Sequence, residues 1–547
     1  MAKVLLIMLI ILSSSARAEE AYLNAMGTIS PDYLKKHTEI LADDIFQGRG
    51  TGTMGGELAS KYLALEYNKY GLTAIGTNDS YYQFIPMHAS KMLPGSELKI
   101  YINDTVYNLD HGKDYELFKY GEQTYYPNPT EMVFSGYGIV APEYDYNDYQ
   151  KIDPEGKIAV FLGGEPISDD ENFFAGTSRS VFSYPDSKQR IALSRGANGS
   201  VYIINPETEF LFSWDEINRG NMEENVQLAY SVSNNLSLML NPETAKKIFN
   251  GAKKSLDEVM NLHSSHAMES FPLKAKLSFI GNFKERDFIA RNVIGMHEGS
   301  DPELKDSYVI ITAHYDHLGI GEPVRGDSVY NGVMDNAIGC AALLELARVF
   351  SKCNVKTKRS IIFLLVTGEE HGLLGSTYYT DHPVRPLYKT IANVNIDGIA
   401  AFDYFKSIIG IGAELSTLEN TLYETARENN VFVSQIPEAF QGSEAFSKSD
   451  QIAFASAGIP AIMLYEGMEY DNMTLEEGIE MQIDYATNRY HTPFDDLTQE
   501  INYDAAKQNT QLLFTLIYKI ANSEVAPQWK DGVIYKNERL RTQAEKR

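Results

Sequence analysis

The strongest constraint on the fold is a repeated order of strand, loop and helix after about residue 285. Short apolar runs rich in β-branched residues cover 309–312, 361–366, 391–396 and 460–464. Residues 336–350 have helical spacing, with Leu343, Leu346, Ala347 and Phe350 on one face. Strands that are apolar on both faces and alternate with helices predict an α/β fold, a mostly parallel mixed sheet sandwiched by helices.

Polar side chains follow these expected strands at their carboxyl ends. His314 comes soon after the first strand, Glu369 and Glu370 after the second, and Asp397 directly after the third. Sheets of this kind bind ligands outside the carboxyl ends of their strands. The convergence of these groups on one edge therefore predicts an active site there.

The residue types at this edge are those that bind zinc-like ions, namely imidazoles and carboxylates. Two histidines and three acids suit two metal ions that share one carboxylate. The expected ligands are His314, Asp335, Glu370, Asp397 and His491. Zinc is the expected metal from the ligand types, although cobalt or manganese suits the same set.

Each acidic residue has an expected role. Asp335 opens a helix from a glycine-bounded loop and is the natural bridge between the two ions, with Glu370 and His491 completing one site and His314 and Asp397 the other. Glu369 points away from its neighbour's metal and is left as the general base that takes the proton of a water held by the metals. We expect Asp316 to hydrogen-bond the imidazole of His314 and to fix its tautomer.

The alternative for each residue alone is ordinary loop structure. A single histidine such as His491 is usually a loop residue, and Asp397-Gly398 is usually a turn. Their joint occurrence after strands favours the site. His317 and His371 are expected to be loop residues or to lie behind the ligands.

The ordered motifs H-x-D, D-N, E-E, D-G and Y-H-T-P-x-D resemble those of the secreted co-catalytic zinc aminopeptidases, metallopeptidase family 28, which includes glutamate carboxypeptidase-like enzymes. The resemblance covers residues 30–95 and 285–525, including G-R-G-T-G at 48–52 and the segment 446–460. It implies a zinc-exopeptidase-like fold, two Zn²⁺ per chain, the same ligand and base assignments, and a cis peptide between Asp335 and Asn336. By itself the glycine-rich segment lacks the Lys-Ser/Thr ending of a phosphate loop.

Residues 96–284 have a different character, with short Val-, Ile-, Tyr- and Phe-rich runs such as 131–140, 157–162 and 200–204 between turn residues. The segments FSGYGIVAPEYDYNDY and GKIAVFLGGEP resemble a protease-associated domain. The predicted organisation is a signal peptide at 1–18, a discontinuous zinc peptidase domain at 19–95 and 285–525, an inserted β-rich protease-associated domain at 96–284, and a polar C-terminal tail at 526–547 whose last residues are frayed.

The amino terminus and the overall charge restrict location and partners. Lys3, the short apolar run 4–12 and Ala16-Arg17-Ala18 predict a signal peptide cut after Ala18, and hence an exported chain without membrane insertion. With 48 basic and 74 acidic residues, the net charge of −26 excludes nucleic acid as a natural partner. Cys340 and Cys353 fall on or near one predicted helix, roughly 20 Å apart at its usual rise, so both are expected to be reduced.

The predicted function is an exported aminopeptidase that removes N-terminal residues from peptides with a free N-terminus. A carboxypeptidase or dipeptidase of the same family is the main alternative. A glutaminyl cyclase, which uses one zinc, and a non-catalytic binding module, which would lose ligands, fit less well because all five ligand positions are present. The loop 435–450 is expected to line the substrate pocket. Side-chain preference and oligomeric state do not follow from the sequence.

Overall fold

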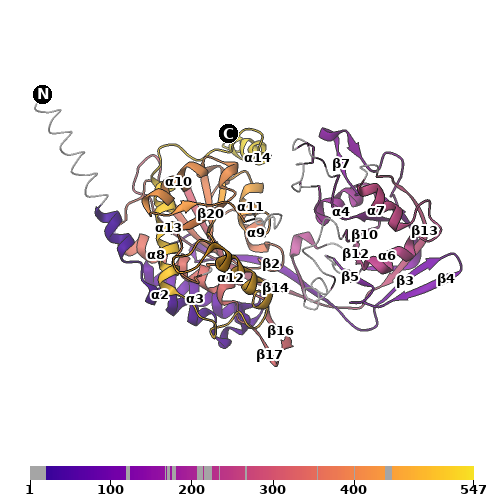
Figure 1. Ribbon diagram of the computed structural model, residues 1–547, viewed down its shortest axis with the longest axis horizontal. Helices are drawn as coiled ribbons and strands as arrows, with labels where there is room; N and C mark the ends of the chain where they lie inside the picture. The colour runs from indigo at the N-terminus through magenta and orange to yellow at the C-terminus, as the bar shows by residue number, and fades with distance from the viewer. Residues whose placement is uncertain are drawn as a thin grey trace, which may run out of the picture. The chain divides into compact units, whose positions relative to one another are not determined.

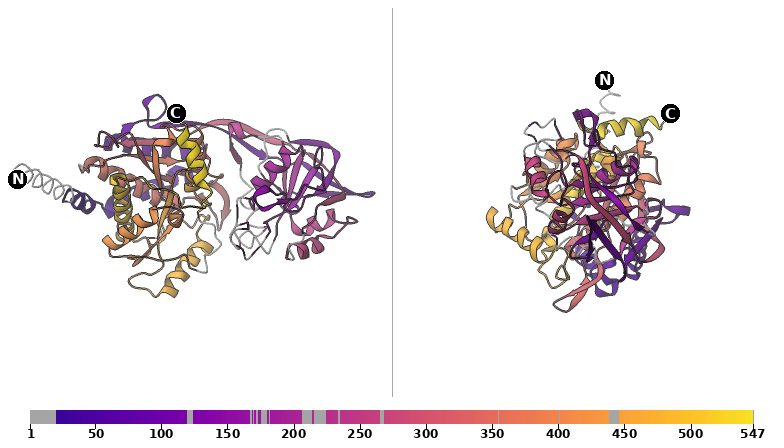
Figure 2. Two further views of the ribbon diagram at one scale, coloured as in Figure 1. Left: turned by 90° about the horizontal axis from the view of Figure 1, so that it is seen from above. Right: turned by 90° about the vertical axis from the view of Figure 1, so that its right-hand side faces the viewer.

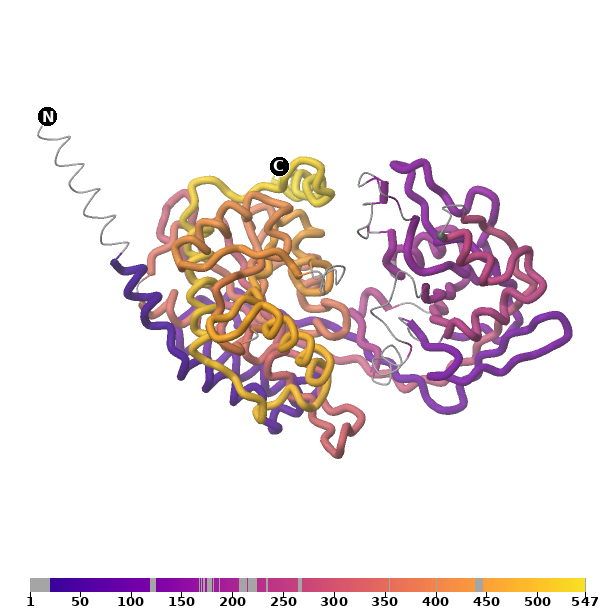
Figure 3. Tube along the Cα trace, viewed as in Figure 1, coloured from indigo at the N-terminus to yellow at the C-terminus, as the bar shows by residue number. Residues whose placement is uncertain are grey.

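The computed structural model describes residues 20–546, except 119–123, 167, 169, 171–172, 175–179, 181, 206–213, 215–223, 233–234, 265–267, 354, 400 and 438–445. The predicted signal peptide therefore lies outside the described residues. The chain divides into two compact units, Met1–Pro86 with Ile289–Arg547, and Met87–Phe288. In Figure 3 the first unit carries the colours of both ends of the chain, and the second carries those between.

A mixed sheet organises the first unit, with neighbouring strands in the order β14-β18-β15-β19-β22-β20-β21 (Figure 1). The strands β18, β15, β19 and β22 run parallel to one another. Strand β14 is antiparallel to β18 and β20 is antiparallel to β22, whereas β21 runs parallel to β20. The bounds are β14 Phe283–His297, β15 Tyr308–His314, β18 Ser360–Val366, β19 Thr390–Asn395, β20 Ser407–Ile411, β21 Phe432–Val433 and β22 Ala461–Glu466. The sheet continues beyond β14 through β2 (Tyr82–Met92) and β11 (Asn225–Leu228), and the short β1 (Thr73–Ala74) also pairs with β14.

Helices cover both faces of this sheet, because alternate residues of its strands are buried on opposite sides. Val309, Ile311 and Ala313 of β15 share a core with α2, α3, α8, α10 and α13, whereas Ile310 shares a second core with α9 and α11. The bounds are α2 Pro31–Leu41, α3 Met54–Tyr70, α8 Ile338–Lys352, α9 Leu374–Asp381, α10 Leu418–Glu428, α11 Gln451–Ser456, α12 Leu475–Asn488 and α13 Tyr503–Asn522. This is the predicted α/β fold, a mixed sheet between helical layers.

Local signals explain several boundaries. Ser30 caps α2 by accepting a hydrogen bond from the Asp32 amide, and proline follows it at the first turn. Helix α3 ends at Gly71, whose φ of 77° is left-handed. Helix α8 begins two residues later than predicted, at Ile338, because Val333–Ala337 forms a separate π-helical turn. A hairpin of β16 (Gly319–Val324) and β17 (Asp327–Tyr330) precedes that turn.

The C-terminal segment 526–547, which was expected to be a polar tail, contains a helix. Residues Tyr535–Ala544 form α14, which packs against α11 and is drawn in yellow in Figure 2. Trp529 is buried and donates a hydrogen bond from Nε1 to the carbonyl of Gly458. These contacts tie the segment to the second core.

The second unit is built on its own sheet, in the order β4-β3-β13-β6-β9-β10-β12-β5. Its cores lie on the two faces of this sheet, one with α6 and α7 and one with α4. The bounds are β3 Glu97–Ile102, β4 Thr105–Leu109, β5 Tyr115–Leu117, β6 Tyr125–Phe134, β7 Val140–Ala141, β8 Tyr146–Asn147, β9 Ile158–Leu162, β10 Gly199–Ile203, β12 Leu236–Leu240, β13 Phe271–Ile280, α4 Pro185–Ser194, α6 Pro242–Ile248 and α7 Leu256–Ser264.

The predicted strand 131–140 is only partly right, since β6 stops at Phe134. Gly136 and Gly138 follow with positive φ, and the carboxylate of Asp148 accepts hydrogen bonds from the amides of Tyr137 and Ile139. The backbone donors that would extend the strand are thus bound by a side chain. That this unit is a protease-associated domain stays a prediction.

Two further predictions concern the state of the cysteines and the insertion of the chain into a membrane. Cys340 and Cys353 are both free, and Cys340 is buried within α8. Among the helices of the described residues, none is long and apolar enough to cross a membrane.

Candidate metal centre

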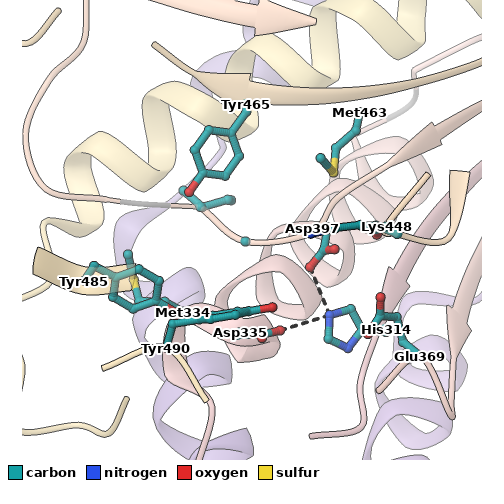
Figure 4. Close-up of a pocket in the computed structure, with 13 residues that line it drawn as sticks. His314, Met334, Asp335, Glu369, Asp397, Lys448, Met463, Tyr465, Tyr485 and Tyr490 are labelled. Carbon is teal, nitrogen blue, oxygen red and sulfur yellow. Dashed lines mark hydrogen bonds and ion pairs between the residues drawn. The ribbon is translucent and has the colours of Figure 1, made fainter. Parts of the chain in front are cut away.

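The predicted ligands gather at one edge of the first unit's sheet, and Figure 4 shows three of them, His314, Asp335 and Asp397. His314 is the last residue of β15, Glu370 lies in the loop after β18, and Asp397 follows β19 by two residues. Asp335 comes from the π-helical turn before α8, and His491 from the loop after α12. Parallel neighbouring strands end at the same edge, which explains how residues far apart in sequence meet.

The carboxylate of Asp335 divides these residues into two groups. Its Oδ1 lies 3.1 Å from Nε2 of His314, and that nitrogen lies 3.0 Å from Oδ1 of Asp397. Its Oδ2 lies 3.3 Å from Nε2 of His491, which lies 3.2 Å from Oε2 of Glu370. Each oxygen of Asp335 therefore faces one imidazole and one further carboxylate.

The electrostatics of this cluster favour bound cations. Burial alone lowers the pKa of His314, but the carboxylates of Asp397, Glu369 and Asp335 outweigh it and raise that pKa well above its usual value. Burial likewise opposes the charge of His491, yet Glu370 and Asp335 raise its pKa. The carboxylates of this cluster thus carry more negative charge than neutral imidazoles can offset. In such a cluster a divalent ion can take the place of the protons on the imidazolium rings.

The donor set fits a metal ion. One ligand atom each from His314, Asp335 and Glu370 lies within 4.8 Å of the others, without side-chain rearrangement. Imidazole nitrogen and carboxylate oxygen are both zinc ligands. The residues present are therefore compatible with zinc.

The side chains of the adjacent Glu369 and Glu370 point to different parts of the site. Glu370 faces the histidines, whereas Glu369 lines the pocket in front of Asp335 and Asp397. Burial raises the pKa of Glu369 well above its usual value, and the neighbouring Asp397 and Glu370 add to that rise although His314 opposes it. A carboxyl group that faces a pocket can both accept and release a proton.

Asp316 supports the site differently from the prediction. Nδ1 of His314 lies 3.2 Å from the backbone carbonyl of Asp316, whereas the carboxylate Oδ1 is 3.9 Å away and forms no hydrogen bond with the ring. The carboxylate instead accepts hydrogen bonds from the Thr51 hydroxyl at 3.0 Å and from the Glu369 amide at 3.3 Å. Asp316 therefore joins the His314 loop to the loop of the candidate base.

The glycine-rich segment 48–52 holds the same loops together. The buried guanidinium of Arg49 donates to the carbonyls of Tyr315, Leu41, Asn331 and Gly332, at 2.8, 2.8, 2.5 and 2.8 Å. Two of these carbonyls precede Asp335 and one adjoins His314. The glycine at 48 is needed because a Cβ there would lie 2.4 Å from the carbonyl oxygens of Gly319 and Tyr330.

Asp495 holds the Asp335 turn from its other side. Its Oδ2 accepts the amide hydrogens of Met334 and Asp335 at 3.1 and 3.0 Å, and its Oδ1 accepts the Gln499 side chain at 2.6 Å. The peptide between Asp335 and Asn336 is cis. The sequence analysis quoted the motif that contains Asp495 but gave that residue no role, although its distance from His491 in the motif was a usable signal.

His317 contacts the ligands from behind. Its Nδ1 lies 2.7 Å from Oε1 of Glu370, and its ring lies edge-on to His491 with ring centroids 5.7 Å apart. It thus orients Glu370. His371 acts on Asp316, because its charge opposes the rise that burial causes in the pKa of that carboxyl group.

A cavity of about 270 Å³ opens in front of the cluster. Figure 4 shows Tyr465, Tyr485 and Tyr490 on one side of it, and Glu369, His314 and Lys448 on the other. Lys448 and Ser449 belong to the loop 435–450 that the sequence predicted for the pocket; residues 438–445 of that loop lie outside the described residues. The cavity can hold a small substrate against the candidate metal ligands.

Comparison with known proteins is consistent with this geometry. The profile of Peptidase family M28 matches residues 292–517, which include every predicted ligand and the candidate base. Residues 292–517 therefore form a peptidase family M28 domain. Aminopeptidase YwaD of Bacillus subtilis (strain 168) is 25% identical over 241 residues, 44% of this chain and 46% of that protein. The probable leucine aminopeptidase 2 of Aspergillus oryzae is 28% identical over 251 residues, with the same two shares.

Both alignments span about half the length of these M28 relatives. Among solved structures, an aminopeptidase from Aneurinibacillus sp. strain AM-1 matches with a TM-score of 0.54 and 18% identity, covering 92% of this chain and 96% of that one. That likeness shows the fold, which is the predicted zinc-exopeptidase-like one.

Proposed function

We propose that this M28 protein is a zinc-dependent aminopeptidase that removes N-terminal residues from peptides. The observation that carries the proposal is the division of the Asp335 carboxylate between two imidazole–carboxylate pairs. A carboxylate shared in this way suits two metal ions about 3.5–4 Å apart. His314 and Asp397 would hold one zinc, and His491 and Glu370 the other.

The roles of the protein's own groups follow from this arrangement. Bound zinc would supply Lewis acidity and a water of lowered pKa. Glu369 faces the pocket, whereas Glu370 faces the histidines. Glu369 therefore accepts the proton of that water and returns it to the leaving amine. Asp316, Arg49, Asp495 and His317 position the loops that carry these groups.

Specificity for the amino end is supported by the aligned relatives, which are an aminopeptidase and a probable leucine aminopeptidase. Among the described residues that line the pocket, Lys448 is the only lysine or arginine. We further propose that the chain is exported after cleavage near Ala18, and that residues 96–284 act as a protease-associated domain.

Metal content and a paired peptide screen test this function. Purified protein is analysed for zinc and incubated with peptides that carry a free or an acetylated N-terminus, with and without chelator. Two zinc ions per chain and chelator-sensitive release of the first residue from free-amine peptides are expected. Cleavage at the carboxyl end would make the protein a carboxypeptidase. No metal and no cleavage, even after zinc is added back, would leave a binding module.

A further inference from the structure

Lys448 is exposed and lines the pocket that contains the candidate base and candidate metal ligands. It lines the same cavity as Glu369 and Asp397, and in Figure 4 it lies on their side, across from Tyr485 and Tyr490. The aromatic side offers apolar surface for the side chain of a substrate's first residue. The opposite side carries the one lysine of the lining, so the two sides offer different chemistry.

The backbone of Lys448 is fixed by a buried network. The next residue, Ser449, accepts a hydrogen bond from Nδ2 of Asn395 at 2.8 Å, and the same amide nitrogen donates to Oε1 of Gln451 at 2.7 Å. Asp450 accepts a hydrogen bond from the Ser376 hydroxyl. Asn395 is two residues before Asp397, so this network ties the lysine's segment to the strand that delivers a candidate ligand.

The direction of the reaction places the leaving residue on the lysine's side. Glu369 returns its proton to the leaving nitrogen, and proton transfer requires that nitrogen within hydrogen-bond reach of the glutamate. The residue that begins with this nitrogen therefore lies on the side of Glu369. In a dipeptide its carboxylate is separated from the nitrogen by only one carbon atom.

We propose that Lys448 binds a carboxylate on the residue that follows the scissile bond, so that dipeptides are preferred substrates. The inference rests on the proposed aminopeptidase function and gives it a substrate class. A lysine ammonium paired with a carboxylate forms a charge-assisted hydrogen bond, which is stronger than one between neutral groups. The same contact selects against amidated or longer peptides, whose carboxylate is absent or displaced.

The carboxylate can come from the chain end or from an acidic side chain at the same position. Three substrates separate these sources: Leu-Gly, Leu-Gly-amide and Leu-Glu-amide. Hydrolysis is measured as kcat/KM for the wild type, for Lys448→Gln and Lys448→Arg, and for the control Lys35→Gln. Lys35 lies on α2 with its side chain 56% exposed, so its replacement changes the net charge equally away from the pocket.

The wild type should favour Leu-Gly over Leu-Gly-amide by about tenfold or more, as one charge-assisted hydrogen bond provides. In Lys448→Gln this ratio should fall to about one, while Lys448→Arg and Lys35→Gln retain it. If Leu-Glu-amide shares the advantage, the side chain also serves as the carboxylate; if it does not, the chain end is the source.

Two results would overturn the inference. If the wild type gave a kcat/KM ratio of about one between each carboxylate-bearing substrate and Leu-Gly-amide, the enzyme would not recognise a carboxylate. An equal loss for acid and amide substrates in Lys448→Gln would show that the lysine only offsets the charge of its carboxylate neighbours. Both results leave aminopeptidase activity on Leu-Gly-amide intact in the wild type. Cleavage of none of the three peptides by zinc-loaded wild type would overturn the proposed function together with the inference.

Discussion

Asp495 provides a direct test of how the Asp335 turn is held. Its carboxylate accepts the amide hydrogens of Met334 and Asp335, and it carries a negative charge close to the candidate bridge. In Asp495→Asn one acceptor becomes a donor, which the Gln499 amide can match by turning over, so the main loss is the charge. In Asp495→Ala both backbone donors lose their acceptor, at a cost of about 1–3 kcal/mol each.

Changes to groups that orient metal ligands lower metal affinity by roughly 10–100-fold. We expect zinc affinity to fall about tenfold in Asp495→Asn, equivalent to about 1.4 kcal/mol, and nearer to 100-fold in Asp495→Ala. The assay is competition for zinc between the apoprotein and a chromophoric chelator, with circular dichroism as a check of folding. Asp496→Asn is the matched control, because Asp496 bonds only locally, to Thr498. Zinc affinity equal to wild type in a folded Asp495→Ala protein would refute the role given to this residue.

Two other buried side chains give predictions of different kinds. A lysine ammonium has three N–H donors, so Arg49→Lys loses at least one of the four hydrogen bonds to carbonyls; the free energy of unfolding of the zinc-free protein, measured with urea, should fall by about 1.5–3 kcal/mol, and an unchanged midpoint would contradict this. Burial lowers the pKa of His37, which bonds to the hydroxyls of Tyr62 and Tyr70, to about 4. The unfolded chain therefore binds a proton first, so stability is full above about pH 6.5 and falls by about 3 kcal/mol as pH drops to 4. Urea midpoints at pH 7.5 and 4.5 should differ less for His37→Gln than for wild type, and equal differences would show that His37 does not contribute.

The sequence was sufficient for the strands and for the positions of the candidate ligands because each leaves a local pattern. Apolar runs marked β15, β18, β19 and β22 to within a few residues, and polar residues directly after them marked the edge where ligands gather. Family motifs marked Asp335 and His491. Their meeting in space followed from one rule, that parallel strands end at the same edge.

The supporting contacts could not be predicted because they join backbone atoms across long separations. Arg49 acts on carbonyls at 315, 331 and 332, and any residue type offers a carbonyl. The same limitation explains Asp316, where the backbone oxygen took the hydrogen bond expected for the carboxylate. The helix in the C-terminal tail was not predicted because the tail is polar, and the burial of Trp529 depends on a hydrogen bond to Gly458, 71 residues away.

The most direct test of the account compares two neighbouring glutamates. Glu369→Gln and Glu370→Gln make the same chemical change one residue apart, and each protein is measured for zinc per chain and for kcat on Leu-Gly-amide. The account predicts that Glu369→Gln keeps two zinc ions and loses roughly 10²–10⁴-fold in kcat, the usual contribution of a general base. Glu370→Gln should bind zinc more weakly at one of the two sites. Near-normal turnover by zinc-loaded Glu369→Gln would contradict the central claim.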